Sequence, residues 1–182
     1  MNWQLYYKNT KFKPPSATLL KAFRYVKKIG KALDLGSGGM HDTQALLEIG
    51  FKVVAVDKEP TPIMNQASFF QSSFESFDFP PKQFDLINAQ YSLFFLKPKD
   101  FPIVWRKIKT SLKKDGIFVG NFIGPRDEWA WTRTMTVLSE SDVRNLFSDM
   151  EILSFTETAQ PRHLASGQNK FWHTFDIIAR KK

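Results

Sequence analysis

The sequence has 182 residues, of which 42% are hydrophobic and 24% are charged, and its formal net charge is +8. These values are typical of one folded domain with a sizeable core, and they exclude an intrinsically disordered chain. The absence of cysteine excludes a disulfide scaffold, a cysteine nucleophile and a thiolate metal site, and no metal site is expected. Because the sequence shows neither a long apolar run nor a secretory signal pattern, we expect a cytoplasmic protein with no membrane partner.

The first predicted elements alternate between helix and strand. Apolar residues at helical spacing predict a helix over residues 16–29, with Ser16 as its N-cap, and a strand over 31–37 follows. The next helix is predicted over 41–49. The β-branched run at 52–57 then has the character of a strand that is buried on both faces.

The same alternation continues through the middle of the chain. In order, the expected elements are a short helix over 61–67, strands over 69–74 and 84–92, an amphipathic helix over 99–114 and a strand over 116–124. Asp115 and Gly116 predict a turn before the last of these strands.

The C-terminal region predicts one more helix and a pair of strands. The helix is expected over 139–150, where Ser139 and Asp142 have the spacing of a capping box. Strands are expected over 151–157 and 171–180 with a loop between them, and such neighbours pair as an antiparallel hairpin. The predicted fold is therefore a single α/β domain with a doubly wound, mostly parallel, seven-stranded Rossmann-like sheet that ends in an antiparallel hairpin.

The carboxyl ends of the first two predicted strands carry the strongest functional signal. The first strand runs into Asp34-Leu35-Gly36-Ser37-Gly38-Gly39, where the glycines allow a tight turn and a close approach of the backbone to a ligand. The second strand ends in Asp57, at the spacing at which a carboxylate accepts hydrogen bonds from ribose hydroxyls. A ligand that contains a nucleoside is therefore expected here.

The charge of the first motif favours one class of nucleoside over another. A dinucleotide-binding motif has a third glycine where this chain has His41, and a pyrophosphate is unfavourable close to Asp34. A ligand with positive charge at that end fits better, as S-adenosylmethionine does with its ammonium and sulfonium groups. A nicotinamide-dependent dehydrogenase is consequently the least favoured interpretation. The alternatives to a binding role are a helix cap for Asp34 and a turn residue for Asp57.

These motifs resemble those of the class I S-adenosylmethionine-dependent methyltransferases. The resemblance rests on ALDLGSGG followed by VVAVD, on FDLINAQYSLFFL and on LKKDGIFVGNFIG. The C-terminal region is similar to small bacterial methyltransferases of the tellurite-resistance type. The resemblance implies a methyltransferase domain over 16–182, preceded by a lid-like segment over 1–15 that includes the aromatic residues from Trp3 to Tyr7.

The resemblance also implies S-adenosyl-L-methionine as the cofactor and assigns residues to it. Asp34, Gly36 and Gly38 correspond to the cradle of the methionine part, and Asp57 with Lys58 to the ribose and adenine contacts. Ser73 stands where the family usually has an acidic residue at the adenine. The full set of expected cofactor-binding residues is Tyr7, Asp34, Leu35, Gly36, Ser37, Gly38, Asp57, Lys58, Ser73, Phe74, Asn88, Ala89 and Gln90.

The expected reaction is direct displacement of the methyl group by a small-molecule acceptor. The acceptor pocket is expected to involve the N-terminal segment and the loops at 124–138 and 159–170. Candidates for acceptor contact or for a general base are Asp127, Glu128, Tyr91 and His173. A salt-bridged surface loop is the equal alternative for the segment around Asp127, and a packing role is the alternative for His173.

Two other functions stay open on the sequence. A nucleic-acid methyltransferase is suggested by the net charge of +8, but the basic residues are scattered along the chain. The segment Asn88-Ala89-Gln90-Tyr91 also lacks the two prolines of the N-P-P-Y motif of many enzymes that methylate base amino groups. The other alternative is a protein that binds the cofactor without turnover.

For the oligomeric state, a monomer or a homodimer is expected.

Overall fold

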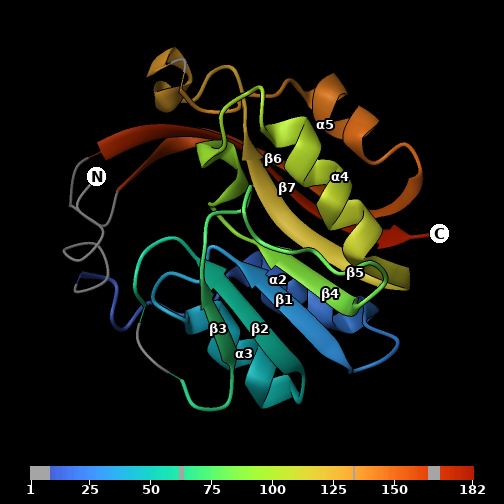
Figure 1. The fold of residues 1–182 in the computed structure, drawn as a ribbon. Coiled ribbons are helices and arrows are strands. Elements are labelled where there is room, and N and C mark those ends of the chain that lie inside the picture. The colour runs from blue at the N-terminus through green and yellow to red at the C-terminus, as the bar shows by residue number, and fades with distance from the viewer. Residues whose placement is uncertain (1–8, 62–63, 133, 164–168) are drawn as a thin grey trace.

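The computed structural model describes residues 9–61, 64–132, 134–163 and 169–182, and its centre is one seven-stranded sheet (Figure 1). The strand order is β3-β2-β1-β4-β5-β7-β6. The strands are β1 (Lys31–Leu35), β2 (Lys52–Asp57), β3 (Ser68–Gln71), β4 (Phe84–Ala89), β5 (Leu112–Ile123), β6 (Met150–His163) and β7 (Asn169–Lys181). The first five strands pair in parallel, and β7 pairs antiparallel with both β5 and β6. The predicted fold class is confirmed.

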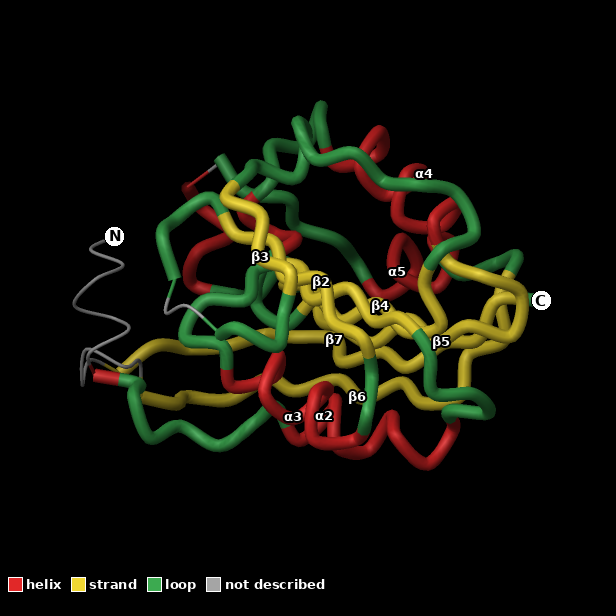
Figure 2. The backbone as a smooth tube through the Cα atoms, turned by 60° about the horizontal axis from the view of Figure 1, so that its bottom comes forward, coloured by secondary structure: helices red, strands yellow, loops and turns green. Residues whose placement is uncertain are grey.

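Helices cover both faces of this sheet (Figure 2). The α-helices are α2 (Ala17–Ala22), α3 (His41–Ile49), α4 (Phe101–Ser111) and α5 (Glu140–Leu146), and the 3₁₀ helices are η1 (Phe23–Tyr25), η2 (Leu93–Phe95) and η3 (Glu128–Thr132). Leu19 of α2 and Leu46 of α3 pack in the core cluster on one face. Trp105 of α4 and Val143 of α5 belong to the cluster on the other face. Both faces of the central strands are thereby buried, which explains their nearly continuous apolar sequences.

Several helix and strand ends were predicted from local signals, and the structure confirms them. Gly50 ends α3 in a left-handed conformation. Ser139 and Asp142 form the expected capping box at α5, because the Ser139 hydroxyl accepts from the Asp142 N–H at 3.1 Å and the Asp142 carboxylate accepts from the Ser139 N–H at 2.9 Å.

The N-terminal half departs from the prediction at two helices. The helix expected over 16–29 ends at Tyr25, because Val26 turns to extended backbone and packs in the core cluster of that face. Ser16 holds the N-cap position, but its side chain makes no capping bond. The helix expected over 61–67 is wrong for its described residues 64–67, which form no helix, and residues 62–63 lie outside the described part.

The turn expected at Asp115 and Gly116 is instead an irregularity inside a strand. The chain enters β5 directly after α4, and Leu112 already pairs with Phe84. Asp115 takes a left-handed φ of 63°, and the register with β4 shifts at this point. The local reversal of the backbone is real, but hydrogen bonds to β4 on either side keep it within the strand.

The loop expected between the last two strands is also wrong over most of its length. The antiparallel pairing of β6 and β7 extends to the pair formed by His163 and Asn169. This outer part of the hairpin is polar and contains Pro161, so its sequence carries no apolar strand pattern. Hydrogen bonds to β7, and not burial against a helix layer, hold the backbone of this outer part in place.

In the described part of the structure, no helix is long and apolar enough to cross a membrane.

Candidate functional site

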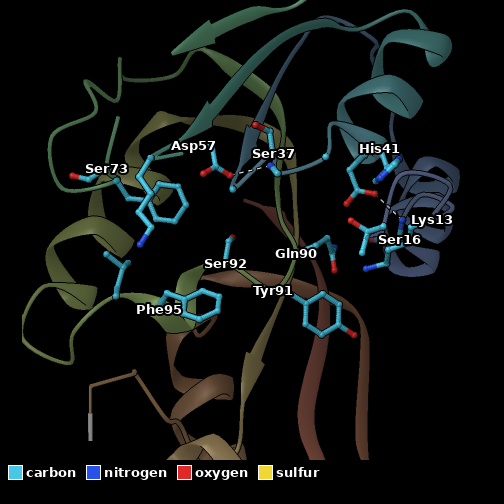
Figure 3. A pocket seen from close by; sticks show the side chains of 18 of the residues that line it. Lys13, Ser16, Ser37, His41, Asp57, Ser73, Gln90, Tyr91, Ser92 and Phe95 are labelled. Atoms are coloured by element: carbon cyan, nitrogen blue, oxygen red, sulfur yellow. Dashed lines mark hydrogen bonds between the residues drawn. The ribbon is translucent and has the colours of Figure 1, made fainter. Parts of the chain in front are cut away.

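A cavity of about 270 Å³ opens where the order of the parallel strands reverses, between β1 and β4 (Figure 3). It is lined by residues at the carboxyl ends of four neighbouring strands. Gly36 follows β1, Asp57 ends β2, Ser72 follows β3 and Gln90 follows β4. Such a switch point is the usual position of a ligand site in an open α/β sheet.

The turn after β1 has to be made of glycine at its first position. Gly36 takes a φ of +80°, and a Cβ atom there would lie 2.4 Å from the Cβ of Ser92. The hydroxyl of Ser92 in turn donates to the carbonyl of Leu35 at 2.7 Å. The tight turn brings Ser37 and Gly38 to the cavity wall, so the backbone rather than side chains forms this part of the site.

Asp57 joins this turn to the end of β2. Its Oδ2 accepts a hydrogen bond from the Gly38 N–H at 2.9 Å, and its Oδ1 accepts from the Glu59 N–H at 3.0 Å. The side chain is mostly buried, yet the residue lines the cavity. A carboxylate has about four lone pairs, so two of them stay able to accept from ligand hydroxyls.

A second carboxylate group lies behind the glycine turn. Asp34 of β1 is fully buried, and it accepts from the Thr43 hydroxyl at 2.5 Å and from the Asn88 amide at 2.8 Å. The Asn88 amide also donates to Asp42 at 3.1 Å. Burial raises the pKa of Asp34 from 3.8 to about 7, and the nearby charge of Asp42 adds to the effect, whereas the bonds from Thr43 and Asn88 oppose it.

Most of the residues expected to bind the cofactor meet at the cavity. The lining includes Gly36, Ser37, Gly38, Asp57, Lys58, Ser73, Phe74 and Gln90. Four other expected residues, Asp34, Leu35, Asn88 and Ala89, lie one layer deeper, in the strands behind the turn. Tyr7 lies outside the described residues.

Four aromatic rings form a continuous wall beside the cavity. Tyr91 and Phe95 line the cavity itself. Trp172 of β7 meets the Tyr91 ring at 5.4 Å and the Trp129 ring at 5.2 Å, and Trp129 reaches Phe95 at 6.0 Å. Of the four catalytic candidates, Tyr91 is therefore the one that lines the cavity. It holds a left-handed φ of 50°, and its N–H donates to the Asn121 side chain at 2.8 Å.

The other three candidates lie at the outer part of the hairpin formed by β6 and β7. Asp127 has no exposed surface, and it forms an ion pair with Lys170, which is also buried. Asp127 further accepts from the N–H groups of Trp129 and His173, each at 3.0 Å. Glu128 accepts from the Phe171 N–H at 2.9 Å. These bonds fasten the loop after β5 to β7, and no described residue of 124–138 or 159–170 lines the cavity.

His173 completes this arrangement on the outer side. Its Nε2 lies 2.8 Å from a carboxylate oxygen of Glu157 on β6, and its Nδ1 accepts from the Arg126 N–H at 3.1 Å. The hydrogen bond from His173 is the main cause of the lowered pKa of Glu157, and Arg126 contributes to it. The Lys170 ammonium lies 3.6 Å from the Trp172 ring centre, and burial lowers the pKa of Lys170 despite its pairing with Asp127.

Several lining residues were not predicted from the sequence. Lys13 comes from the N-terminal segment, Ser16 is the N-cap residue of α2, and His41 and Asp42 come from the start of α3. The Ser16 N–H donates to Asp42 at 2.7 Å across 26 residues of sequence. An acidic residue in the first turn of the helix after a glycine-rich loop was the available signal for Asp42. Nothing local in the sequence indicated Lys13.

Two buried polar atoms in the cavity wall have no partner among the described residues. They are the hydroxyl of Ser37 and Nε2 of His41. Unpaired buried polar atoms are costly, so both are positions where a ligand would complete the hydrogen bonding. Within the described ranges, no three His, Asp or Glu side chains gather as they would around a metal ion. The cavity therefore has the chemistry of a site for a polar organic ligand with hydroxyl groups and a positively charged end.

Comparison with known proteins agrees with this geometry. Residues 33–120, from β1 into β5, match the family described as methyltransferase domain. No curated protein sequence matches the chain.

Solved structures share the fold at low sequence identity. TehB from Haemophilus influenzae superposes with a TM-score of 0.76 at 16% identity, covering 92% of this chain, which spans 62% of that chain. The 1,6-didemethyltoxoflavin-N1-methyltransferase of Burkholderia thailandensis, solved with S-adenosylhomocysteine, gives a TM-score of 0.68 at 18% identity and coverages of 91% and 79%. A SAM-dependent methyltransferase of Methanosarcina mazei gives 0.68 at 18% identity and coverages of 87% and 95%. The match over residues 33–120, the strand order and the glycine turn together show that the chain has the fold of S-adenosylmethionine-dependent methyltransferases and is similar to their methyltransferase domain.

Proposed function

We propose that the protein transfers the methyl group of S-adenosylmethionine to a small-molecule acceptor bound against the aromatic wall of the cavity. The observation that carries this proposal is the continuity of one cavity from Asp57 and Ser73 on one side to Tyr91 and Phe95. The first part suits the nucleoside, and the second part suits an acceptor next to it.

The cofactor half of the proposal rests on the residues that line the glycine turn. Asp57 would accept from the ribose hydroxyls, and Lys58, Ser73 and Phe74 would hold the adenine, since all four residues line the cavity. Ser37 offers the unpaired hydroxyl described above. The Asp42 carboxylate and the buried carboxyl of Asp34 lie near the methionine end, where they favour the ammonium and the sulfonium and disfavour a phosphate.

The acceptor half rests on the aromatic wall and on the size of the cavity. Rings of Tyr91 and Phe95 supply a largely apolar surface, and Trp129 and Trp172 fix them from behind. Thr10, Lys13 and Pro14 of the N-terminal segment line the same cavity and close one side of it. The described part of the cavity has a volume of about 270 Å³, which favours a compact acceptor.

The protein's part in the reaction is to align the acceptor with the methyl group and to exclude water. Bound S-adenosylmethionine supplies a methyl group activated by the sulfonium. The left-handed backbone at Tyr91, held by Asn121, sets the ring of Tyr91 at the cavity wall beside the end of β4. Orienting an acceptor in line with the reacting bond in a water-poor site provides the rate enhancement. We assign Tyr91 to acceptor contact, and Asp127, Glu128 and His173 to holding the loop that carries Trp129.

The experiment is an acceptor screen with tritium-labelled S-adenosylmethionine. The panel contains small phenols, amines, thiols, carboxylates and inorganic oxyanions, with transfer RNA and duplex DNA as separate samples. We expect label in at least one small acceptor and none in nucleic acid. Label in nucleic acid alone would contradict the small-acceptor proposal, and cofactor binding without any labelled product would favour a non-catalytic binding protein.

Once an acceptor is found, the aromatic wall is tested through Tyr91. We expect Y91A to raise the KM for the acceptor at least tenfold while the affinity for S-adenosylhomocysteine stays within twofold of wild type. Y91F keeps the ring and serves as the matched control, with a KM close to that of wild type. An unchanged KM in Y91A would show that Tyr91 does not contact the acceptor.

A further inference from the structure

Charged groups line both sides of the cavity (Figure 3). Asp57 and Ser73 lie on one side of Ser37, and His41, Lys13 and Ser16 lie on the other. The first side is the one that we assign to adenosine. The second side contains a carboxylate and an ammonium group, both of which line the cavity.

The carboxylate on this second side is Asp42, in the first turn of α3. Its Oδ1 accepts from the Ser16 N–H at 2.7 Å, and its Oδ2 accepts from the Asn88 amide at 3.1 Å. These two bonds fix the orientation of the carboxylate and leave one further lone pair on each oxygen. The same Asn88 amide donates to Asp34 at 2.8 Å, so Asn88 holds the two carboxyl groups in place side by side.

An independent observation indicates that a ligand belongs beside this carboxylate. Ser37 lines the cavity and is only 6% exposed, and among the described residues its hydroxyl has no hydrogen-bond partner. His41, the neighbour of Asp42, has an unpartnered Nε2 in the same wall. Both atoms would be satisfied by a polar group that enters this end of the cavity.

The ammonium group belongs to Lys13 of the N-terminal segment. The Lys13 side chain is exposed, and its Nζ lies 5.6 Å from the centre of the Tyr91 ring at the cavity wall. The backbone N–H of Ser16, three residues later, is the group that Asp42 holds. The bond from Ser16 to Asp42 thus fastens the segment that carries Lys13 to the start of α3, at the same end of the cavity.

We propose that Asp42 and Lys13 together recognise a zwitterionic α-amino acid group, with Asp42 accepting from its ammonium and Lys13 donating to its carboxylate. The proposal rests on the proposed function, because such a group forms the end of S-adenosylmethionine remote from the adenine. It assigns the recognition of this end to two side chains that the sequence motifs do not contain, one of them on the N-terminal segment.

Calorimetric titration with two ligands distinguishes recognition of the amino acid group by Asp42 and Lys13 from a general effect of the substitutions on the site. S-adenosylhomocysteine carries the amino acid group, and 5′-methylthioadenosine has the same adenosine and thioether without it. We expect D42N and K13M each to weaken S-adenosylhomocysteine at least tenfold and to leave 5′-methylthioadenosine within twofold of wild type. E48Q on the exposed face of α3 and K28M, outside the cavity lining, are the matched controls and should bind both ligands as wild type does.

Equal weakening of both ligands in D42N and K13M, or wild-type affinity for S-adenosylhomocysteine in both, would overturn the inference and leave the proposed function standing. Wild-type protein that binds neither ligand would contradict the proposed function and the inference with it. Thermal melting of each variant identifies a folding defect. If D42N fails to fold, K13M decides the question, because Lys13 is an exposed side chain outside the core.

Discussion

Asp34 shows how a residue at the end of a buried strand acquires an unusual protonation equilibrium. Its carboxyl lies among β1, β4 and α3, where two hydrogen bonds hold it, and among the described residues the charges that act on it are those of Asp42 and Asp57. Burial and the Asp42 carboxylate disfavour its charged form, and these effects exceed those of the two bonds. A cationic ligand end near this group favours ionisation, so cofactor binding and proton release are linked at this position.

The linkage predicts how the stability of the ligand-free protein depends on pH. Because the pKa of Asp34 is raised from 3.8 to about 7, folding takes up a proton between these values, and the contribution of Asp34 to stability falls as the pH rises through that window. Asn does not titrate, so the free energy of unfolding of D34N relative to wild type should increase by up to about 1.4 kcal/mol per pH unit. Urea denaturation at pH 5, 6 and 7, with E48Q as the control, measures this difference. A difference that stays constant or falls with pH would show that Asp34 ionises normally in the fold.

The buried ion pair between Asp127 and Lys170 predicts a large effect of a single substitution. K170M leaves the Asp127 carboxylate buried without its cation, which costs about 3–5 kcal/mol in the free energy of unfolding. The double variant D127N/K170M removes the stranded charge and should recover part of the loss. Urea denaturation of both variants provides the test. A free energy of unfolding of K170M within about 1 kcal/mol of that of wild type would mean that the ion pair is not a stabilising contact.

The residues of the site differ in how far they could be predicted. Gly36, Gly38 and Asp57 lie directly at strand ends, so strand assignment alone brought them together at one edge of the sheet. Asp42 follows the glycine turn at the start of α3, whereas Lys13 belongs to a segment that the bond from the Ser16 N–H to Asp42 holds against α3, a contact that no local pattern encodes.

At the scale of elements, burial decided which strands could be recognised. β1 and β2 are apolar because helices cover both of their faces, and their predicted ranges hold within two residues. The outer part of β6 and β7 has no helix layer over it, so its polar sequence was indistinguishable from that of a loop. The end of β4 was predicted too late because the chain leaves the strand at a tertiary contact, the bond that the Tyr91 N–H donates to the Asn121 side chain. The end of α4 was predicted too late because the chain enters β5 directly after Ser111.

The capping box of α5 gives a prediction at this same scale. S139A removes the hydroxyl that accepts from the Asp142 N–H and should cost about 1 kcal/mol, which lowers the melting temperature by roughly 2–4 °C for a chain of this size. S148A, after the end of the same helix, is exposed and is expected to melt as wild type does. Melting by circular dichroism compares the two variants, and equal melting temperatures would mean that the cap does not stabilise α5.

At the scale of the whole molecule, the site is a consequence of the strand order. The reversal between β1 and β4 opens the cavity at the carboxyl ends of the strands, and the helix layers on both faces leave that edge uncovered. Thr10, Lys13 and Pro14, together with the aromatic wall, border it. Nearly all of the described chain serves the sheet, its helices or this enclosure, which is why we expect specificity to reside in the short segments around the cavity.

The most direct test of this account is calorimetric titration of S-adenosylhomocysteine into wild type and D57A. Loss of a charge-assisted hydrogen bond to ribose costs about 1.5–3 kcal/mol, or roughly ten- to a hundred-fold in affinity. D149A removes an exposed carboxylate distant from the cavity lining and serves as the control. We predict micromolar binding by wild type and D149A, with D57A weaker by that factor. Absence of binding to wild type, or equal binding by D57A, would contradict the assignment of this cavity to the methyl donor.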